Sequence, residues 1–441
     1  MKEFMRVNAN ATDDFDEARK VERTGKLLIL AFVAFVCPLG ARILSIDIGI
    51  ARLSVYRIAL IIALIALIYL STVGHGVFAW KKENAVIVFF LSVWLVYAVI
   101  TGFWAIDISN WVRNVYFLAG GVFLTIYCLN SIRSLKSFTQ ILLCFNMGIA
   151  VQAGIGIYEI LTKDYHFIDM EGVNYSYYVL SEARIPIAML GNPNDFATLM
   201  YIGIIISAVC VVLTKQKLVR FFNAGLAIVF SILLVLTKSR ACLVGLIVTI
   251  AFFLLFIGYK GWGILTVIIA ASLCTTKVER FVSRFLEFDF VSGNNSEGIR
   301  VNLIKNGFLF LEKTFGFGVG AGQVESWMKT KAVFATRNIT SMHNWWMEIL
   351  TSYGIIIFIG YLLVYSLTFY CFAKAMHRTA RKEIRNTCAF ICASLVGYVI
   401  VSVSASSNLT SEYIWLSWAL IITLQGIIMK EEGVKCPVLF S

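Results

Sequence analysis

Charged residues are scarce in this chain of 441 residues. Asp, Glu, Lys and Arg make up 15% of the sequence, whereas hydrophobic residues make up 59%. Soluble globular chains carry about 25% charged residues, so the composition excludes an ordinary soluble domain. Proline is also rare, with four residues in all, and the near absence of this helix breaker suits long helices. The sequence therefore predicts an all-α polytopic membrane protein.

Long apolar runs support this class. Leu53–Leu70, Ala85–Trp104 and Ala241–Gly258 continue for 18 to 20 residues with almost no charge. A helix needs about 20 apolar residues to cross the hydrocarbon layer, and a transmembrane β-barrel would instead alternate apolar and polar residues. The whole pattern predicts about 12 transmembrane helices, near residues 27–41, 53–73, 85–104, 112–130, 138–160, 196–214, 218–236, 241–258, 261–276, 345–373, 387–407 and 413–429.

The distribution of basic residues predicts the orientation. With twelve spans both termini lie on one side, which holds 21 of the Lys and Arg residues, against 17 on the other side. Nine of those 17 fall in the single long segment 277–343, and long loops count little toward orientation. Both termini are therefore expected in the cytoplasm. The net charge of +12 follows this pattern, so we do not expect nucleic acid as a partner.

The predicted organisation has five parts. A cytoplasmic N-terminal tail, 1–26, lacks the pattern of a cleaved signal peptide. Nine transmembrane helices occupy 27–276, and a large extracytoplasmic loop occupies 277–343. Three more transmembrane helices occupy 344–430, and a cytoplasmic tail, 431–441, ends the chain. The large loop begins with Phe281, Phe285 and Phe288 at helical spacing, which predicts an amphipathic helix at the membrane surface.

Signals for metals and nucleotides are missing. The sequence has no CxxC pair and no cluster of His, Asp and Glu with ligand spacing on the external side, so no metal is expected. The run "FGFGVGAG" at 315–322 lacks the GK[ST] ending of a phosphate-binding loop and is interpreted as a flexible turn. No cofactor is therefore expected.

The chain has only four histidines, and one of them, His343, stands where a hydrophobic helix begins, in "SMHNWWMEILTSYGI". Capping by Asn344 and interfacial anchoring by the two tryptophans explain the other residues of this stretch and leave the histidine unexplained. A neutral imidazole is the natural general base near pH 7. His343 is thus the strongest single candidate for catalysis.

Several Lys, Arg and Asn residues lie near the predicted external ends of helices. Arg240 and Lys238 in "TKSRA" flank a helix start, which is a reasonable seat for phosphate, although an interfacial Arg could equally reach for lipid headgroups. Arg300 opens a helical stretch in the large loop. Arg184 precedes "GNPND", where Asn194 follows a proline and Asp195 can cap the next helix; a turn with a cap is the simpler interpretation of that stretch.

Four elements in this order, "GNPNDFA", "TKSRA", Arg300 followed by "FGFGVGAG", and "HNWWMEILTSYGI", resemble the O-antigen ligase and polysaccharide polymerase family of bacterial membrane enzymes. The resemblance implies a fold of the GT-C-like membrane glycosyltransferase type with about a dozen helices. It also implies glycosyl transfer outside the cytoplasmic (inner) membrane of a bacterium, without metal, from a glycan on undecaprenyl diphosphate. Many members have an acidic residue where this chain has Ser352.

The resemblance also assigns roles to residues. Arg240 and Arg300 would hold the diphosphate, and His343 would take the proton from the attacking hydroxyl. Asn344 would orient the site, while Arg184, Lys238 and Asn194 would be further substrate contacts. The expected partners are the lipid-linked glycan donor, a glycan acceptor and the bilayer, with a chain-length regulator or a flippase as further candidates.

Four functions remain open on the sequence. Polymerisation of lipid-linked repeat units into an O-antigen, capsule or exopolysaccharide is slightly favoured over ligation of a finished glycan onto lipid A core or another acceptor. A transporter for lipid-linked glycans would usually carry charges within its spans and show repeated halves, and neither is visible here. A purely structural scaffold would need neither Arg240 nor His343.

Overall fold

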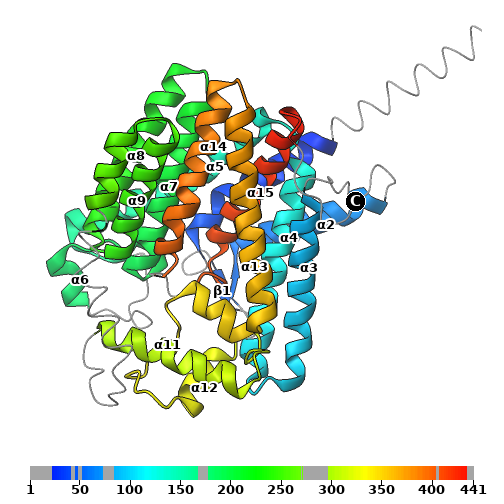
Figure 1. Cartoon of the computed structure of the whole chain (residues 1–441), viewed down its shortest axis with the longest axis vertical. Helices are drawn as coiled ribbons and strands as arrows, with labels where there is room; N and C mark the ends of the chain where they lie inside the picture. The colour runs from blue at the N-terminus through cyan, green and yellow to red at the C-terminus, as the bar shows by residue number, and fades with distance from the viewer. Residues whose placement is uncertain are drawn as a thin grey trace, which may run out of the picture.

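The structure is a computed structural model, and it describes residues 22–40, 45–47, 52–72, 84–166, 177–269, 271, 296–403 and 407–434. Within these ranges the chain is almost entirely helical, and its long helices form an upright bundle (Figure 1). Among the described helices, eight are long and apolar enough to cross a membrane: Ala85–Trp104, Ile108–Ser131, Leu135–Thr162, Pro193–Leu213, Lys217–Leu236, Trp345–Arg378, Lys382–Val401 and Glu412–Glu431. The prediction of an all-α multi-pass membrane protein is thereby supported.

Three further apolar helices, Val55–Tyr69, Arg240–Phe256 and Lys260–Ile269, are shorter. They coincide with the predicted second, eighth and ninth spans, and the described helix 22–36 coincides with the first. The total of twelve spans and the five-part division of the chain stay predictions. The predicted amphipathic helix at the start of the large loop lies outside the described residues.

The elements follow one another with few interruptions. A short antiparallel hairpin, β1 (Ser45–Asp47) and β2 (Arg52–Ser54), pairs Ile46 with Leu53. The remaining elements are η1 (Cys37–Leu39), α2 (Val55–Thr72), α3 (Ala85–Ile100), η3 (Thr101–Trp104), α4 (Ile108–Ser131), α5 (Leu135–Thr162), α6 (Tyr177–Ala183), η5 (Ala188–Leu190), α7 (Pro193–Leu213), α8 (Lys217–Leu236), α9 (Arg240–Phe256), α11 (Ser296–Lys313), α12 (Val324–Lys331), α13 (Trp345–Arg378), α14 (Lys382–Val401) and α15 (Glu412–Glu431).

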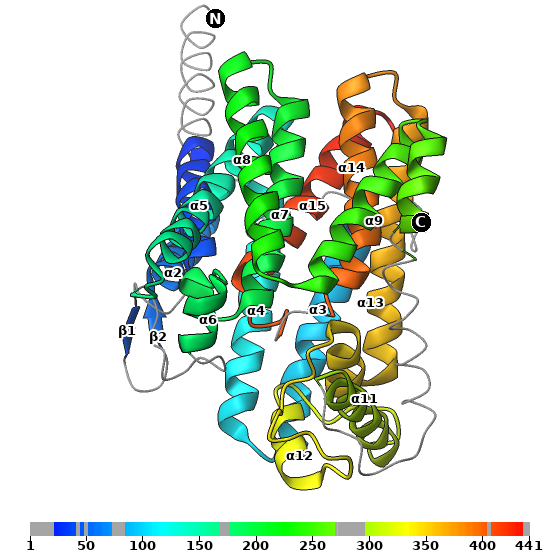
Figure 2. The ribbon, with the colours of Figure 1, turned by 90° about the vertical axis from the view of Figure 1, so that its left-hand side faces the viewer.

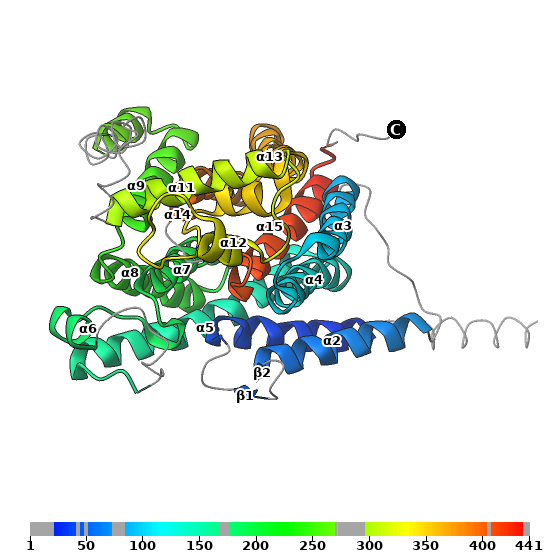
Figure 3. The ribbon, with the colours of Figure 1, turned by 90° about the horizontal axis from the view of Figure 1, so that it is seen from below.

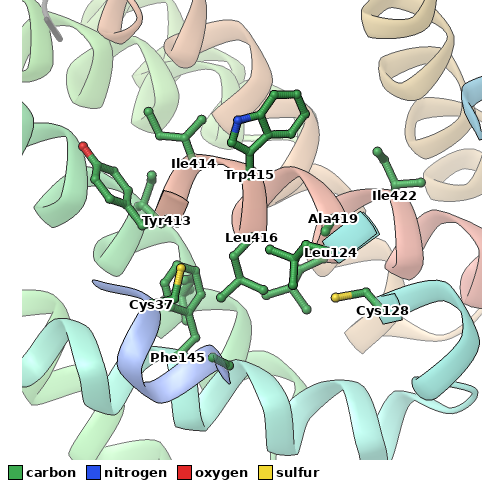
Figure 4. Packing of buried hydrophobic residues seen from close by; sticks show 14 of the residues in the cluster. Cys37, Leu124, Cys128, Phe145, Tyr413, Ile414, Trp415, Leu416, Ala419 and Ile422 are labelled. Carbon is green, nitrogen blue, oxygen red and sulfur yellow. The ribbon is translucent and has the colours of Figure 1, made fainter. Parts of the chain in front are cut away.

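Helix α15 lies at the centre of the bundle and has the largest buried share of the eight long helices. Figure 4 shows Leu416 of α15 pointing toward Leu124 of α4 and Phe145 of α5, while Trp415 points to the other side of α15. A side chain at Gly121 of α4 would collide with the Trp415 ring, so the glycine lets the two helices approach closely. An apolar helix that is covered on most faces serves as the axis around which the other helices pack.

Helices α11 and α12 lie across one end of the bundle, which we call the loop end (Figures 1 and 2). Gln323, just before α12, binds the backbone between η3 and α4, because its Oε1 accepts from Ile106 N and Asp107 N, both at 2.9 Å. At the opposite end, Arg381 before α14 pairs with Glu431 at the close of α15, with 2.6 Å between N and O. Each end of the bundle is thus closed by its own polar contacts.

The glycine run 315–322 is a fixed connection rather than the flexible turn that the sequence predicted. Val319 N donates to Thr351 O and Gly320 N donates to Ser352 O, both at 2.9 Å. One turn further on, Ile355 N donates to Gly316 O, also at 2.9 Å. These bonds form at Gly354, where α13 has non-helical backbone with φ of 77°. The interruption of α13 frees backbone groups, and the glycine run satisfies them.

Replacing Gly354 by Ala should destabilise the protein. A Cβ at this position would lie 2.3 Å from Gly316 O, on a backbone with positive φ, so strain of about 1–3 kcal/mol or more is expected. The measurement is thermal unfolding of the purified protein in detergent. Gly154→Ala is the control, because Gly154 is helical and has nothing within 4 Å of its Cβ position. Equal unfolding temperatures for the two variants would contradict this account of the break.

Candidate functional site

The cap of α7 differs from the prediction. Asn192, and not Asp195, is the N-cap, since its side chain accepts from Asn194 N at 2.8 Å. Pro193 follows at the first helical position, where a missing N–H costs nothing, and Asp195 lies in the first turn. The local pattern "NPND" offers several capping side chains, and only the Asn192 side chain adopts the geometry.

The motifs "GNPND" and "TKSRA" meet at the loop end. Ser239 Oγ donates to Asn194 Oδ1 at 2.8 Å, which joins the first turn of α7 to the N-cap of α9. Lys238 and Arg240 flank Ser239, and both are exposed. Lys238 is in the left-handed region, with φ of 59°, which makes the sharp turn between α8 and α9. Two cations thus stand at the start of a helix, where the partial positive charge also favours an anion.

His343 and Arg300 are electrostatic neighbours. Burial, and then the positive charge of Arg300, lowers the pKa of His343 to about 4. The imidazole is therefore uncharged at neutral pH and can accept a proton. Its Nδ1 is buried and has no hydrogen-bond partner within the described structure. His343 also has a φ of 47°, a conformation that a non-glycine residue rarely adopts and that is often found at functional positions.

The residues that follow His343 fix where α13 begins. Asn344 is the N-cap, as predicted, and its Oδ1 accepts from Trp346 N at 3.1 Å and from Met347 N at 3.3 Å. Trp345 Nε1 donates to Tyr361 Oη at 2.9 Å, and Trp346 Nε1 donates to Val399 O at 3.2 Å. The Trp345 bond lies within α13, whereas the Trp346 bond joins the start of α13 to α14. The Trp345 ring also lies 6.3 Å from the Trp94 ring of α3, so both tryptophans contact neighbouring helices next to His343.

Helix α14 contacts both the start region of α9, which carries Arg240, and the start of α13, which follows His343. The side chain of Val401, near its end, lies against Gly245 of α9, about one and a half turns from Arg240. The next residue, Ser402, accepts a hydrogen bond from Trp345 N at 3.2 Å. The start of α9 and the start of α13 are thereby tied to the same helix end.

Arg184 lies in the turn between α6 and η5. Its guanidinium donates to Ile160 O at 3.3 Å, near the end of α5, and its own φ is 50°. The neighbouring segment is held to α5 by Glu159, whose carboxylate accepts from Ile187 N at 2.8 Å and from Ala188 N at 2.9 Å. The observed contact gives Arg184 a structural role in this turn, and its role as a substrate contact stays a prediction.

Sequence reasoning missed a polar group one turn into α13. Glu348 accepts a hydrogen bond of 2.6 Å from Ser407 Oγ, and Asn408 beside it is only 2% exposed. The side-chain amide of Asn408 and the hydroxyl of Tyr353 are buried without a hydrogen-bond partner in the described part of the chain. An acidic residue in an apolar helix is itself a signal, because such a charge is costly. Its partner 59 positions away in sequence is not visible from the sequence.

The chain is similar to known proteins over the range that contains these residues. A family model described as O-antigen ligase matches residues 202–362. This range contains Lys238, Arg240, Arg300, His343 and Asn344. A curated relative, the teichuronic acid biosynthesis protein TuaE of Bacillus subtilis (strain 168), is 23% identical over 363 residues, which is 80% of this chain and 74% of that protein.

Both findings support the family that the motifs predicted. They are consistent with an O-antigen ligase or polymerase-like membrane protein that acts in polysaccharide biosynthesis. They also agree with the apolar helices of the structure, which support a multi-pass membrane protein.

The cap at Asn344 generates a prediction. Asn344→Ala should destabilise the protein by about 0.5–2 kcal/mol, because two N–H groups of α13 lose their acceptor. Asn344→Asp keeps an acceptor at the same place and should stay close to the parent protein. Thermal unfolding in detergent measures both. An Asp variant as unstable as the Ala variant would show that Asn344 does not act through its cap.

Proposed function

We propose that this chain is a membrane glycosyltransferase that polymerises oligosaccharide repeat units carried on undecaprenyl diphosphate into a cell-surface polysaccharide. The proposed location is the cytoplasmic membrane of a bacterium, with both termini inside and the loop end outside. The observation that carries the proposal is the placement of a buried, strained histidine directly before α13, within electrostatic reach of Arg300 of α11 and at the same end of the bundle as Lys238 and Arg240.

The proposed step is an inverting displacement. A hydroxyl oxygen of the acceptor sugar forms a bond to the anomeric carbon of the donor glycan, and the bond from that carbon to the diphosphate oxygen breaks. The proton of the hydroxyl moves to His343, and the electron pair leaves with the lipid diphosphate. Charge develops on the leaving diphosphate, where Arg240 and Arg300 would stabilise it with donors that suit phosphate oxygens.

The empty and the substrate-bound site would differ in charge. Without substrate, Arg300 opposes protonation of His343. A bound diphosphate would offset that positive charge and raise the proton affinity of the imidazole. The donor would thus strengthen the base that its own reaction needs.

Ligation is the second candidate, because the matching family model is described as O-antigen ligase. In that reaction the same residues would transfer a finished glycan from undecaprenyl diphosphate to lipid A core or another acceptor. The relative named for teichuronic acid biosynthesis supports a role in polysaccharide biosynthesis and does not favour either of the two reactions.

Variants in the native strain test the function. His343→Ala should lower transfer by about 10²- to 10⁴-fold, as expected for loss of a general base. Arg240→Ala should lower it by about 10²- to 10³-fold, as expected for loss of a group that stabilises the leaving charge. Lipid-linked glycans are extracted and sized, with the level of protein in the membrane as a control.

The products distinguish the candidates. Single repeat units left on the lipid indicate a polymerase, whereas full-length chains left on undecaprenyl diphosphate indicate a ligase. Unchanged glycans in both variants would contradict the assignment of these residues and return a transporter or scaffold to consideration.

The pH dependence supplies another prediction. At low donor concentration, where the rate reports the free enzyme, transfer should persist down to mildly acidic pH and fall as the pH drops through about 4, where His343 becomes protonated. Arg300→Gln removes the repulsion and should raise the pKa of His343 toward its ordinary 6.5, so the acid limb of the rate profile moves to higher pH. Lys313→Gln is the control. An acid limb at the same pH in all three proteins would show that His343 is not the titrating base.

A further inference from the structure

The turn between α8 and α9, which carries Lys238 and Arg240, has a constrained backbone. Lys238 has a φ of 59°, a conformation that is uncommon for residues other than glycine. Thr237, the C-cap of α8, supports the turn from within, because its Oγ1 donates to Leu234 O at 2.6 Å and accepts from Ser239 N at 3.2 Å. The direction in which α9 begins therefore depends on a defined turn.

The hydroxyl of Ser239 is directed away from its own helix. Ser239 is the N-cap of α9, and a serine at this position usually caps the helix with its side chain. Among the described residues its hydroxyl makes no capping bond and donates instead to Asn194 Oδ1 of α7 at 2.8 Å. Ser239 is only 6% exposed, so water competes little for this bond. The serine thus joins two helices at the point where α9 starts.

Asn194 is itself held firmly in the first turn of α7. Its N–H donates to Asn192 Oδ1 at 2.8 Å, and its carbonyl oxygen accepts from Thr198 Oγ1 at 2.9 Å. The next residue, Asp195, is tied to the central helix, since Tyr413 Oη of α15 donates to Asp195 O at 3.2 Å. An acceptor that is fixed in this way can fix the position of its partner on α9.

The body of α9 is held by other contacts. Figure 3, seen from the loop end, shows α9 close to α14. A Cβ at Gly397 of α14 would lie 2.0 Å from Thr249 Oγ1 and 2.5 Å from Gly245 O, so the two helices meet backbone to backbone. Tyr201 Oη of α7 lies 2.8 Å from Thr249 Oγ1. These contacts fix the middle of α9, whereas the bond to Asn194 acts at the first turn, where Arg240 stands.

We propose that Asn194 is a positioning residue for Arg240 and that it acts through Ser239, without touching the substrate. This rests on the proposed function, in which Arg240 stabilises the leaving diphosphate. The amide oxygen of Asn194 is engaged by Ser239 and holds the first turn of α9 in the orientation that presents Arg240. Such placement matters for the rate, because an error of about 1 Å in the position of a catalytic group can cost about 10²-fold.

The test is a double-mutant cycle on the full-length protein in nanodiscs. The substrate is the lipid-linked glycan extracted from the Arg240→Ala strain. Asn194→Ala and Ser239→Ala should each lower kcat by about 10- to 10²-fold rather than raise KM, because Arg240 acts on charge that develops during transfer. The double variant should be no slower than the slower single variant, because both changes remove the same bond.

Ser207→Ala is the matched control. Ser207 accepts from Asn146 Nδ2 at 3.0 Å, so this change removes a bond between the same two residue types, about three and a half turns further along α7. Its kcat per folded protein should equal that of the parent, and Ser239→Thr, which keeps the hydroxyl, should retain most of the rate. Losses that multiply in the double variant would overturn the proposal, since Asn194 would then act on the substrate directly. Parental kcat in both single variants would overturn it as well.

Amide hydrogen exchange separates the two levels of inference. In Asn194→Ala the exchange of residues 237–243 should become faster while the rest of α9 exchanges as in the parent, whatever reaction the protein performs. Parental exchange in this turn would contradict the positioning role alone. Parental glycans in cells that carry His343→Ala or Arg240→Ala would contradict the proposed function.

Discussion

The hydrogen bonds between the glycine run and the break in α13 decide where the rest of the loop end lies. A helix that stops and restarts within an apolar bundle leaves N–H and C=O groups that need partners. Here the partners are Val319 N, Gly320 N and Gly316 O, which belong to the segment that follows α11. The same bonds therefore complete the broken helix and dock α11 and α12 onto the bundle.

That docking also explains the two glycines that face each other. A Cβ at Gly318 would lie 2.5 Å from Gly354 N, and both residues have positive φ. The backbones can approach only because neither residue has a side chain. As α13 is then held at its break and at its cap, the residue before the cap, His343, has little freedom to move. Its position is set by the backbone contacts that follow it, at Trp345 and at the break, rather than by a hydrogen bond of its buried Nδ1.

Composition and local pattern predicted a good part of this molecule. The class follows from the lack of charge, and the cap at Asn344 follows from a polar residue directly before an apolar helix. These features depend on neighbours in sequence. The prediction of Asp195 as the cap of α7 failed because several side chains at "NPND" satisfy the same rule, and only the path of the chain selects Asn192.

Contacts between segments far apart in the chain could not be predicted from local sequence patterns. The glycine run looked like a flexible turn because its partner, the break at Gly354, is more than 30 positions away. Glu348 was overlooked because Ser407, which binds its carboxylate, belongs to the segment before α15. The hydrogen bond between Asn194 and Ser239 joins residues 45 positions apart. Both motifs and their order are visible in the sequence, but the contact between them is not.

On the proposed function, the candidate site would treat its two substrates differently. Arg240, Arg300 and His343 would address features that any donor and any acceptor of this chemistry share, namely a diphosphate and a hydroxyl. These residues would therefore not select one acceptor over another. Selection would have to come from surfaces that contact the rest of the glycan. A change of acceptor within this architecture would then require changes away from the helix starts, while Arg240, Arg300 and His343 could stay the same.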